Sequence, residues 1–277
     1  MEPALQRRVQ RYGWDKAVDD YERFWSAQLQ PAQDRLLEMA ALESGEHVLD
    51  LACGTGLVSL PAARAVGPSG RLVGTDISAR MVERAREEAH REGLSHAVFE
   101  RMGAEALDLP DGAFDVVLCA LGLMYLPDAS AALHEMRRVL APGGRAVVAV
   151  WGARGKCGWA DIFPIVDARV RSEVCPLFFM LGTGERLAHE LASADFTDVT
   201  AERLSAVLEY ATADDALGAA FAGGPVAMAY SRFDEATRAA AHAEYLASIA
   251  AYRQGEGYRI PGEFVVARGT RPAPEAA

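Results

Sequence analysis

The apolar positions of this chain form short runs that alternate with amphipathic stretches from residue 47 onward. Apolar positions at helical spacing predict helices at 57–66, 78–92 and 129–140. Runs rich in Val and Leu, without polar alternation, predict strands at 47–52, 70–76, 97–102, 114–120 and 145–151. Strands of this kind, separated by amphipathic helices, are typical of a parallel sheet that is covered on both faces.

The rest of the chain extends this pattern at both ends. Residues 15–42 predict an amphipathic helix with a break at Pro31, and residues 1–46 a helical cover. The later predicted elements are a strand at 197–210, Ala-rich helices over 213–253 that break at Gly223-Gly224-Pro225, a last strand at 262–268 and a loose tail at 270–277. We therefore expect an α/β fold with a doubly wound, seven-stranded, mostly parallel sheet, in a domain spanning residues 47–277.

A glycine-rich turn after the first strand is the strongest local signal of chemistry. Gly54 and Gly56 follow the run Val48 to Cys53, and Asp76 ends the next strand roughly 20 residues later, which is the spacing of a nucleotide site. An aspartate at that place can accept hydrogen bonds from both hydroxyls of a ribose. Ser59 stands where a dinucleotide-binding motif would have its third glycine, which disfavours NAD.

Several ordered blocks extend this signal over about residues 14–151. They are Val48 to Gly56, Gly74 to Ser78, Met81, Gly103-Ala104-Glu105, Phe114 to Val117, and Arg138 to Arg145. In these blocks the chain resembles the class I S-adenosylmethionine-dependent methyltransferases, and among them the ubiquinone/menaquinone-biosynthesis type that acts on small molecules. The resemblance implies a Rossmann-like sheet whose last strand runs antiparallel between the fifth and sixth strands.

The resemblance also implies where S-adenosyl-L-methionine, and its product S-adenosyl-L-homocysteine, would lie. Asp76 would hold the ribose, and Asp50 would be either a partner of the cofactor ammonium through water or a charge that caps the turn. The remaining implied contacts are Gly54, Gly56 and the Ala52 backbone beneath the amino-acid end, Ile77 and Met81 around the adenine, Ala104 and Glu105 at the adenine edge, Ala120 and Leu121 at the methionine part, and Tyr21 and Trp25 from the N-terminal helix. Tyr125 would face the methyl group or the acceptor, as the one catalytic candidate.

An aromatic-rich segment at 152–187 follows the fifth strand, and we expect it to be a helical insertion. A segment that leaves the carboxyl end of that strand lies beside the crevice where open α/β sheets bind ligands. We therefore predict an acceptor pocket there, with the alternative that the segment is a cap packed for stability alone. The substrate-binding candidates are Trp151, Trp159, Phe163, Phe178 and Phe179.

Composition and charge disfavour several classes of binding partner. The formal charge is −11, from 28 basic and 39 acidic side chains, which disfavours nucleic acid and anionic membranes. Without a signal-peptide core or a long apolar run, the chain is expected to be cytoplasmic. Cysteines 53, 119, 157 and 175 lack metal-site spacing, so no metal is predicted, and a thiol or metalloid role for Cys157 and Cys175 stays open.

These observations favour an S-adenosylmethionine-dependent methyltransferase that transfers a methyl group by in-line displacement to a small, partly apolar acceptor. The acceptor atom, C, N, O or S, is not indicated, and neither is a general base or an oligomeric state. Two alternatives are an NAD-dependent oxidoreductase on a related sheet and a cofactor-binding protein without catalysis.

Overall fold

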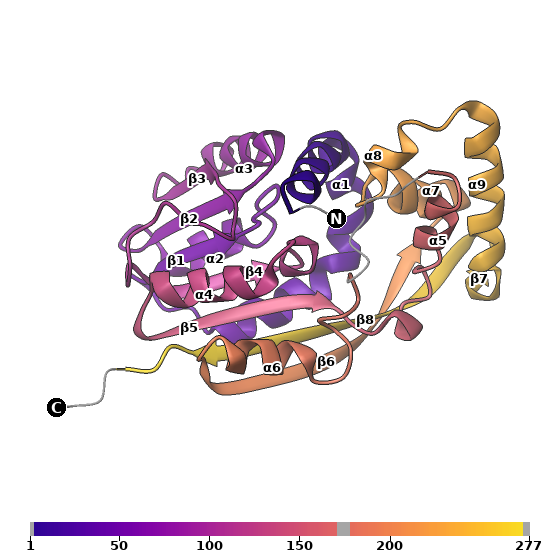
Figure 1. The fold of residues 1–277 in the computed structure, drawn as a ribbon. Helices are drawn as coiled ribbons and strands as arrows, with labels where there is room; N and C mark the ends of the chain where they lie inside the picture. The colour runs from indigo at the N-terminus through magenta and orange to yellow at the C-terminus, as the bar shows by residue number, and fades with distance from the viewer. Residues whose placement is uncertain (1–2, 171–177, 274–277) are drawn as a thin grey trace.

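A twisted sheet with five neighbouring parallel strands forms the centre of the molecule (Figure 1). The computed structural model describes residues 3–170 and 178–273. The parallel strands are β1 (His47–Leu51), β2 (Arg71–Asp76), β3 (Ala97–Arg101), β4 (Phe114–Ala120) and β5 (Leu140–Trp151). Within the described residues the strand order is β3-β2-β1-β4-β5-β8-β6, and the two-residue β7 (Arg253–Gln254) pairs with β8. The doubly wound, mostly parallel sheet is confirmed, with seven strands in its main order and β7 as a short addition.

Two long strands complete the sheet beyond β5. Strand β8 (Gly257–Thr270) runs antiparallel to both β5 and β6 (Thr197–Tyr210), as the resemblance implied. It begins earlier than the predicted residue 262. The strand includes Pro261, which lies opposite Val207 of β6. The Pro261 carbonyl accepts a hydrogen bond from the Gly158 N–H at 2.8 Å.

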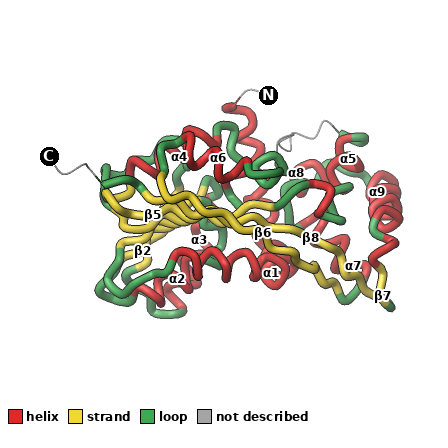
Figure 2. The backbone as a smooth tube through the Cα atoms, turned by 90° about the horizontal axis from the view of Figure 1, so that it is seen from below, coloured by secondary structure: helices red, strands yellow, loops and turns green. Residues whose placement is uncertain are grey.

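Helices cover both faces of the sheet. Figure 2 shows α1 (Pro3–Ala40) and α2 (Ser59–Val66) on one face, and α4 (Ala129–Val139) and α6 (Arg186–Ser193) on the other. Helix α3 (Ala79–Arg91) follows β2 and contacts α1. No helix in residues 3–170 and 178–273 is both long and apolar enough to cross a membrane.

Helix α1 departs from the sequence prediction in two ways. It starts at Pro3, and it continues through the predicted break at Pro31. An interior proline costs a helix about 3 kcal/mol, but Leu29, Ala32 and Leu36 on the same segment are fully or almost fully buried. Their packing against the core outweighs the lost hydrogen bond, so the predicted break at Pro31 was wrong.

The Pro-Gly-Gly segment predicted to turn before the fifth strand is a bulge inside β5. The pairing with β4 passes from Leu140 opposite Phe114 to Arg145 opposite Val116. Residues 141–144 therefore lie outside the regular ladder, and Gly143 takes a left-handed backbone with φ 81°. The strand thus starts at residue 140, where the sequence predicted residue 145.

Small helices gather beyond the end of the sheet at the right of Figure 1. The insertion after β5 contains α5 (Ile162–Asp167), so its predicted helical character is confirmed. The later helices are α7 (Ala213–Leu217), a π-helical turn (Gly218–Ala222), α8 (Ala227–Tyr230) and α9 (Glu235–Ser248). The chain leaves helical geometry at Gly223-Gly224-Pro225, where the sequence predicted a break.

Candidate active site

A single cavity lies at the carboxyl ends of β1, β2 and β4, beneath α1. It encloses about 1030 Å³ of empty space, counting the part that is open to solvent. Most of the residues singled out in the sequence line it: Tyr21, Trp25, Ala52, Gly54, Asp76, Ile77, Met81, Ala104, Glu105, Ala120, Leu121, Tyr125, Trp151 and Trp159. The chain therefore brings the predicted cofactor residues and two predicted acceptor residues to one continuous space.

The glycine-rich turn uses its two glycines differently. Gly54 lines the cavity with a left-handed backbone, φ 55°, which allows a ligand close to the main chain. Gly56 also has a positive φ, 95°, but it lies outside the cavity lining. A Cβ on Gly56 would stand 3.3 Å from Leu60 Cγ of α2 and at an ordinary 3.5 Å from the Cβ of Ala85 in α3, so the positive φ is the main reason for glycine here.

Asp76 ties the turn after β1 to the turn after β2. Its Oδ2 accepts a hydrogen bond from the Gly54 N–H at 3.0 Å, and its Oδ1 accepts one from the Ser78 N–H at 2.8 Å. Burial raises the pKa of Asp76 to about 6, against the effect of these two bonds. The carboxylate is fixed at the cavity wall, and each oxygen keeps lone-pair capacity for a further donor such as a ribose hydroxyl.

Asp50 lies behind the cavity wall and does not line it. Its Oδ2 accepts a hydrogen bond from the Ser59 hydroxyl at 2.5 Å. Its Oδ1 is buried and has no partner among the described residues, and burial raises the pKa of this carboxyl to about 7. Ser59, which replaces the third glycine of a dinucleotide motif, is therefore the hydrogen-bond partner of Asp50. Because Asp50 does not line the cavity, its unpaired Oδ1 could contact a ligand only through a water.

An apolar slot lies next to Asp76. Ile77, Met81 and Met102 line it, together with Ala104. Such a slot fits a planar base between apolar surfaces. Glu105 stands at its edge, but Arg7 donates to its Oε2 at 2.9 Å and the Asp128 N–H donates to its Oε1 at 3.0 Å. Each carboxylate oxygen of Glu105 thus accepts one hydrogen bond and, like the oxygens of Asp76, keeps capacity for a further donor such as an adenine amino group.

Two non-glycine residues of the cavity lining have left-handed backbones. Ala52, after β1, has φ 54°, and Leu121, after β4, has φ 60°. Such conformations cost free energy and are concentrated at functional sites. A Cβ on the adjacent Gly122 would lie 2.4 Å from the Ala52 Cβ, so the two loops approach closely only because residue 122 is glycine.

Tyr21 and Tyr125 both line the cavity. Both are linked to Trp14 through edge-on ring contacts, with centroid distances of 5.7 and 5.2 Å. Burial raises the pKa of both hydroxyls well above the ordinary range, and for Tyr21 the charge of Asp76 adds to this effect. Both residues are therefore neutral phenols at physiological pH, able to donate a hydrogen bond and unsuited to act as bases.

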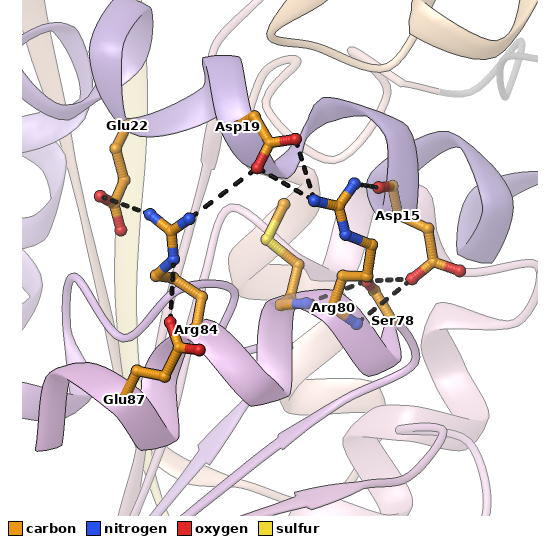
Figure 3. A network of polar contacts seen from close by, with 8 residues as sticks. Asp15, Asp19, Glu22, Ser78, Arg80, Arg84 and Glu87 are labelled. Atoms are coloured by element: carbon orange, nitrogen blue, oxygen red, sulfur yellow. Dashed lines mark hydrogen bonds and ion pairs between the residues drawn. The ribbon is translucent and has the colours of Figure 1, made fainter. Parts of the chain in front are cut away.

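Helix α1 is held over the site by an ionic network with α3, shown in Figure 3. Arg80 bonds to both carboxylate oxygens of Asp19, at 3.0 and 2.9 Å, and to the Asp15 carbonyl at 2.8 Å. The Ser78 hydroxyl donates to Asp15 Oδ1 at 2.6 Å, and Arg84 lies 3.8 Å from Asp19. We call this set of contacts the α1–α3 network.

Three indole rings line the cavity beside the end of β5, which β1 and β4 separate from β2 and Asp76 in the sheet. We call this part of the cavity the indole end. Trp25, Trp151 and Trp159 line it, with centroid distances of 6.0 Å for Trp25–Trp151, 5.9 Å for Trp25–Trp159 and 4.8 Å for Trp151–Trp159. The other predicted acceptor residues, Phe163, Phe178 and Phe179, do not line the cavity. They pack behind Trp159 at 5.8, 5.9 and 5.6 Å.

Several residues that line the cavity were not predicted from the sequence. Gly223, Gly224 and Pro225 line the indole end, although in sequence they signalled only a helix break. The first turns of α1 also contribute, because Arg7 and Gln10 line the site from a segment without apolar periodicity. The aromatic Trp14, just before the predicted helix at 15–42, was the one sequence feature that could have indicated that this segment lines the cavity. The other missed residues lie beside predicted ones: Leu29, Met102, Gly103, Gly122, Met124, Leu126 and Pro127.

The three cysteines that the structure describes do not line this cavity. Cys53, Cys119 and Cys157 are buried free thiols, while Cys175 lies outside the described residues. Among the described residues there is no group of three or more His, Cys, Asp or Glu side chains that could hold a metal ion.

Comparisons with known proteins place this geometry in a family. Residues 48–144 match the model of a methyltransferase domain. The chain is 34% identical over 145 residues to the aklanonic acid methyltransferase DauC of Streptomyces sp. (strain C5), covering 52% of this chain and 66% of that protein. It is 42% identical over 113 residues to the ubiquinone/menaquinone biosynthesis C-methyltransferase UbiE of Hahella chejuensis, covering 40% of this chain and 45% of that protein.

The match thus spans less than two thirds of the length of either relative. Among solved structures, the YcgJ protein of Bacillus subtilis superposes with a TM-score of 0.62 at 16% identity, covering 88% of this chain and 99% of that one. This likeness shows the fold, and the sequence matches lie on the elements that build the Asp76 end of the cavity. Residues 48–144 therefore form a methyltransferase domain, and over this part the chain is similar to S-adenosylmethionine-dependent methyltransferases of the ubiquinone/menaquinone-biosynthesis type.

Proposed function

We propose that this protein transfers the methyl group of S-adenosyl-L-methionine to a small, partly apolar acceptor. The observation that carries the proposal is that one cavity is lined by the fixed carboxylate of Asp76, by Tyr21 and Tyr125, and by the rings of the indole end. One space can therefore hold a nucleoside at one end and an apolar molecule at the other.

The residues at the Asp76 end fit the cofactor. Asp76 would accept hydrogen bonds from the ribose hydroxyls, and the slot of Ile77 and Met81 would hold the adenine. Gly54, together with the left-handed Ala52 and Leu121, would bring main-chain groups to the amino-acid end. The open Oδ1 of buried Asp50 is suited to a water that bridges to the ammonium.

The bound cofactor supplies a sulfonium methyl group that is already activated for displacement. The chain's own part is then to align the acceptor and exclude water, because proximity and desolvation carry much of the rate in such a transfer. Tyr125 is our catalytic candidate. It lines the cavity from the turn after β4, and its neutral hydroxyl would orient the acceptor by donating a hydrogen bond.

The acceptor would lie against Trp25, Trp151 and Trp159, with Gly223 and Gly224 leaving room beside them. Phe163, Phe178 and Phe179 would support these rings from behind. The carboxylates among the described lining residues, Asp76 and Glu105, are both held by donors at the opposite end. We therefore expect an acceptor that needs no side-chain base from the indole end.

The direct test is incubation of the purified protein with methyl-labelled S-adenosyl-L-methionine and a panel of hydroxyaromatic, polyketide-like and amine compounds. Mass spectrometry should show products heavier by one labelled methyl group, and Tyr125→Phe should slow their formation without weakening cofactor binding. Tight cofactor binding without transfer to any compound class would instead favour a cofactor-binding protein without catalysis.

A further inference from the structure

The two ends of the aromatic insertion after β5 touch each other. A Cβ on Gly182 would collide with the Trp151 carbonyl oxygen and stand 2.7 Å from the Gly152 Cα. The chain therefore leaves the sheet and returns to it at one place, and we call residues 151–153 and 182–184 the base of the insertion. Trp151, which belongs to this base, also lines the cavity.

Glu263 of β8 holds the first side of the base. Its carbonyl accepts a hydrogen bond from the Gly152 N–H at 2.6 Å, and its Oε2 accepts one from the Ala153 N–H at 3.1 Å. The next residue, Phe264, packs its ring against that of Trp151 with a centroid distance of 4.2 Å. Glu263 therefore fixes the backbone that directly follows Trp151.

Arg203 of β6 holds the second side of the base and joins it to the first. Its Nη2 donates to the carbonyls of Gly182, at 2.9 Å, and Gly184. Its Nη1 donates to Glu263 Oε2 at 2.7 Å. A planar guanidinium can serve several acceptors at once because its donors are fixed in a fork. The Arg203–Glu263 pair thus connects both ends of the insertion to the sheet.

The burial of this pair sets it apart from a similar pair on the same two strands. The Glu263 side chain is only 13% exposed and that of Arg203 38%, so water screens their attraction only in part. Arg259 and Glu209 also pair across β8 and β6, at 3.0 Å, but they are 50% and 63% exposed. Neither of these two bonds to the part of the insertion that the structure describes, which makes them a matched comparison.

We propose that Arg203 and Glu263 are positioning residues for methyl transfer, because closing the base of the insertion holds Trp151 and Trp159 in the wall of the indole end. This inference rests on the proposed function, in which these rings contact the acceptor. Neither Arg203 nor Glu263 lines the cavity itself. The cofactor end is held by separate contacts of Asp76, so loss of the pair should loosen one end of the cavity and leave the other intact.

Hydrogen exchange of residues 153–170 in the full chain measures how firmly the base is closed. Arg203→Gln and Glu263→Gln should each speed this exchange, by roughly 3- to 30-fold for the loss of a partly exposed, charge-assisted bond. The double variant should be no faster than Arg203→Gln, because both substitutions remove the same ion pair. Arg259→Gln is the matched control and should leave the exchange unchanged.

Fluorine NMR of the protein made with fluorinated tryptophan reports on the cavity wall. The chain contains four tryptophans, at positions 14, 25, 151 and 159, so each signal can be assigned by single replacement with Phe. In Arg203→Gln the signals of Trp151 and Trp159 should shift or broaden, while that of Trp14 stays in place. The affinity for S-adenosyl-L-homocysteine, measured by calorimetry, should not change.

Other outcomes would overturn the proposal. Unchanged Trp151 and Trp159 signals, or exchange that speeds equally in β1, would reduce the pair to a general contribution to stability. If Arg203→Gln does not fold, Arg203→Lys retains the charge but lacks the fork that reaches both carbonyls, and the same signals decide. Failure of the wild type to bind S-adenosyl-L-homocysteine would refute the proposed function instead, while the exchange and fluorine results would still show whether the pair holds the two rings.

Discussion

Removing the α1–α3 network should speed the release of the cofactor product. The variant is Arg80→Gln combined with Arg84→Gln, which deletes the cationic side of the contacts in Figure 3. Helix α1 covers the cavity and supplies Tyr21 and Trp25 to its lining. We therefore expect α1 to move away from α3 when S-adenosyl-L-homocysteine leaves.

The size of the effect follows from the exposure of the network. Arg80 and Asp19 are 52% and 60% exposed, so their paired hydrogen bonds are partly screened by water. Exposed ion pairs contribute about 0.2–1 kcal/mol each, and the deleted contacts together contribute about 1–2 kcal/mol. Because 1.4 kcal/mol corresponds to a factor of ten, the release rate should rise roughly 5- to 30-fold.

Stopped-flow measurement of S-adenosyl-L-homocysteine release tests this at low and high salt. Added salt screens the network, so the wild-type rate should approach that of the double variant. Arg91→Gln is the matched control, because Arg91 pairs with Glu88 within α3. Equal release rates and equal salt dependence in wild type and double variant would refute the idea that this network holds α1 closed.

Three further results are expected. Asp76→Ala should weaken S-adenosyl-L-homocysteine binding by roughly 2–4 kcal/mol in calorimetry with an unchanged circular dichroism spectrum, and unchanged affinity would refute the ribose assignment. Burial raises the carboxyl pKa values of Asp50 to about 7 and Asp76 to about 6, so between these values and about pH 4 the native state holds protons that the unfolded chain has released. The free energy of unfolding should therefore fall as pH rises from about 4 and level off above about 7, with a smaller fall in Asp50→Asn. A flat wild-type profile in urea titrations would contradict this. Gly224→Ala, whose Cβ would meet only ordinary contacts at 3.5 and 3.7 Å, should raise the KM of the acceptor alone. Gly122→Ala, whose Cβ would clash at 2.4 Å, should also weaken the binding of the cofactor. Equal effects of the two variants would argue against separate ends of the cavity.

The sheet and the Asp76 end of the site could be predicted because their signals are local. A buried strand, a turn that needs left-handed residues and a carboxylate at the next strand end are all set by short stretches of sequence. The structure adds what those stretches cannot show, such as the use of both Glu105 oxygens by Arg7 and Asp128. Arg7 lies 98 residues from Glu105, a contact that only the folded chain creates.

The cavity residues that were not predicted from the sequence are placed there by tertiary contacts. Gln6 and Gln10 are buried where an amphipathic helix would place apolar side chains, and the Gln6 amide donates to the Tyr125 carbonyl at 3.4 Å. Because glutamines occupy these buried positions, the first turns of α1 show no hydrophobic periodicity in the sequence. Similarly, Gly224 signals a break in sequence, and its place in the cavity wall depends on how the helices around it pack.

The indole end was predicted in outline and revised in detail. Trp151 and Trp159 line the cavity, whereas Phe163, Phe178 and Phe179 form the layer behind them. Aromatic content marks a segment as part of a pocket or core, but it does not tell which ring faces inward. That distinction depends on the path of the chain after β5.

Calorimetric titration of the purified protein with S-adenosyl-L-homocysteine, and in parallel with NAD, decides which cofactor the cavity binds. We expect micromolar binding of S-adenosyl-L-homocysteine and no binding of NAD, because Asp76 and the apolar slot fit one nucleoside and Ser59 replaces the third glycine of a dinucleotide motif. Binding of NAD without S-adenosyl-L-homocysteine would contradict it and favour an oxidoreductase.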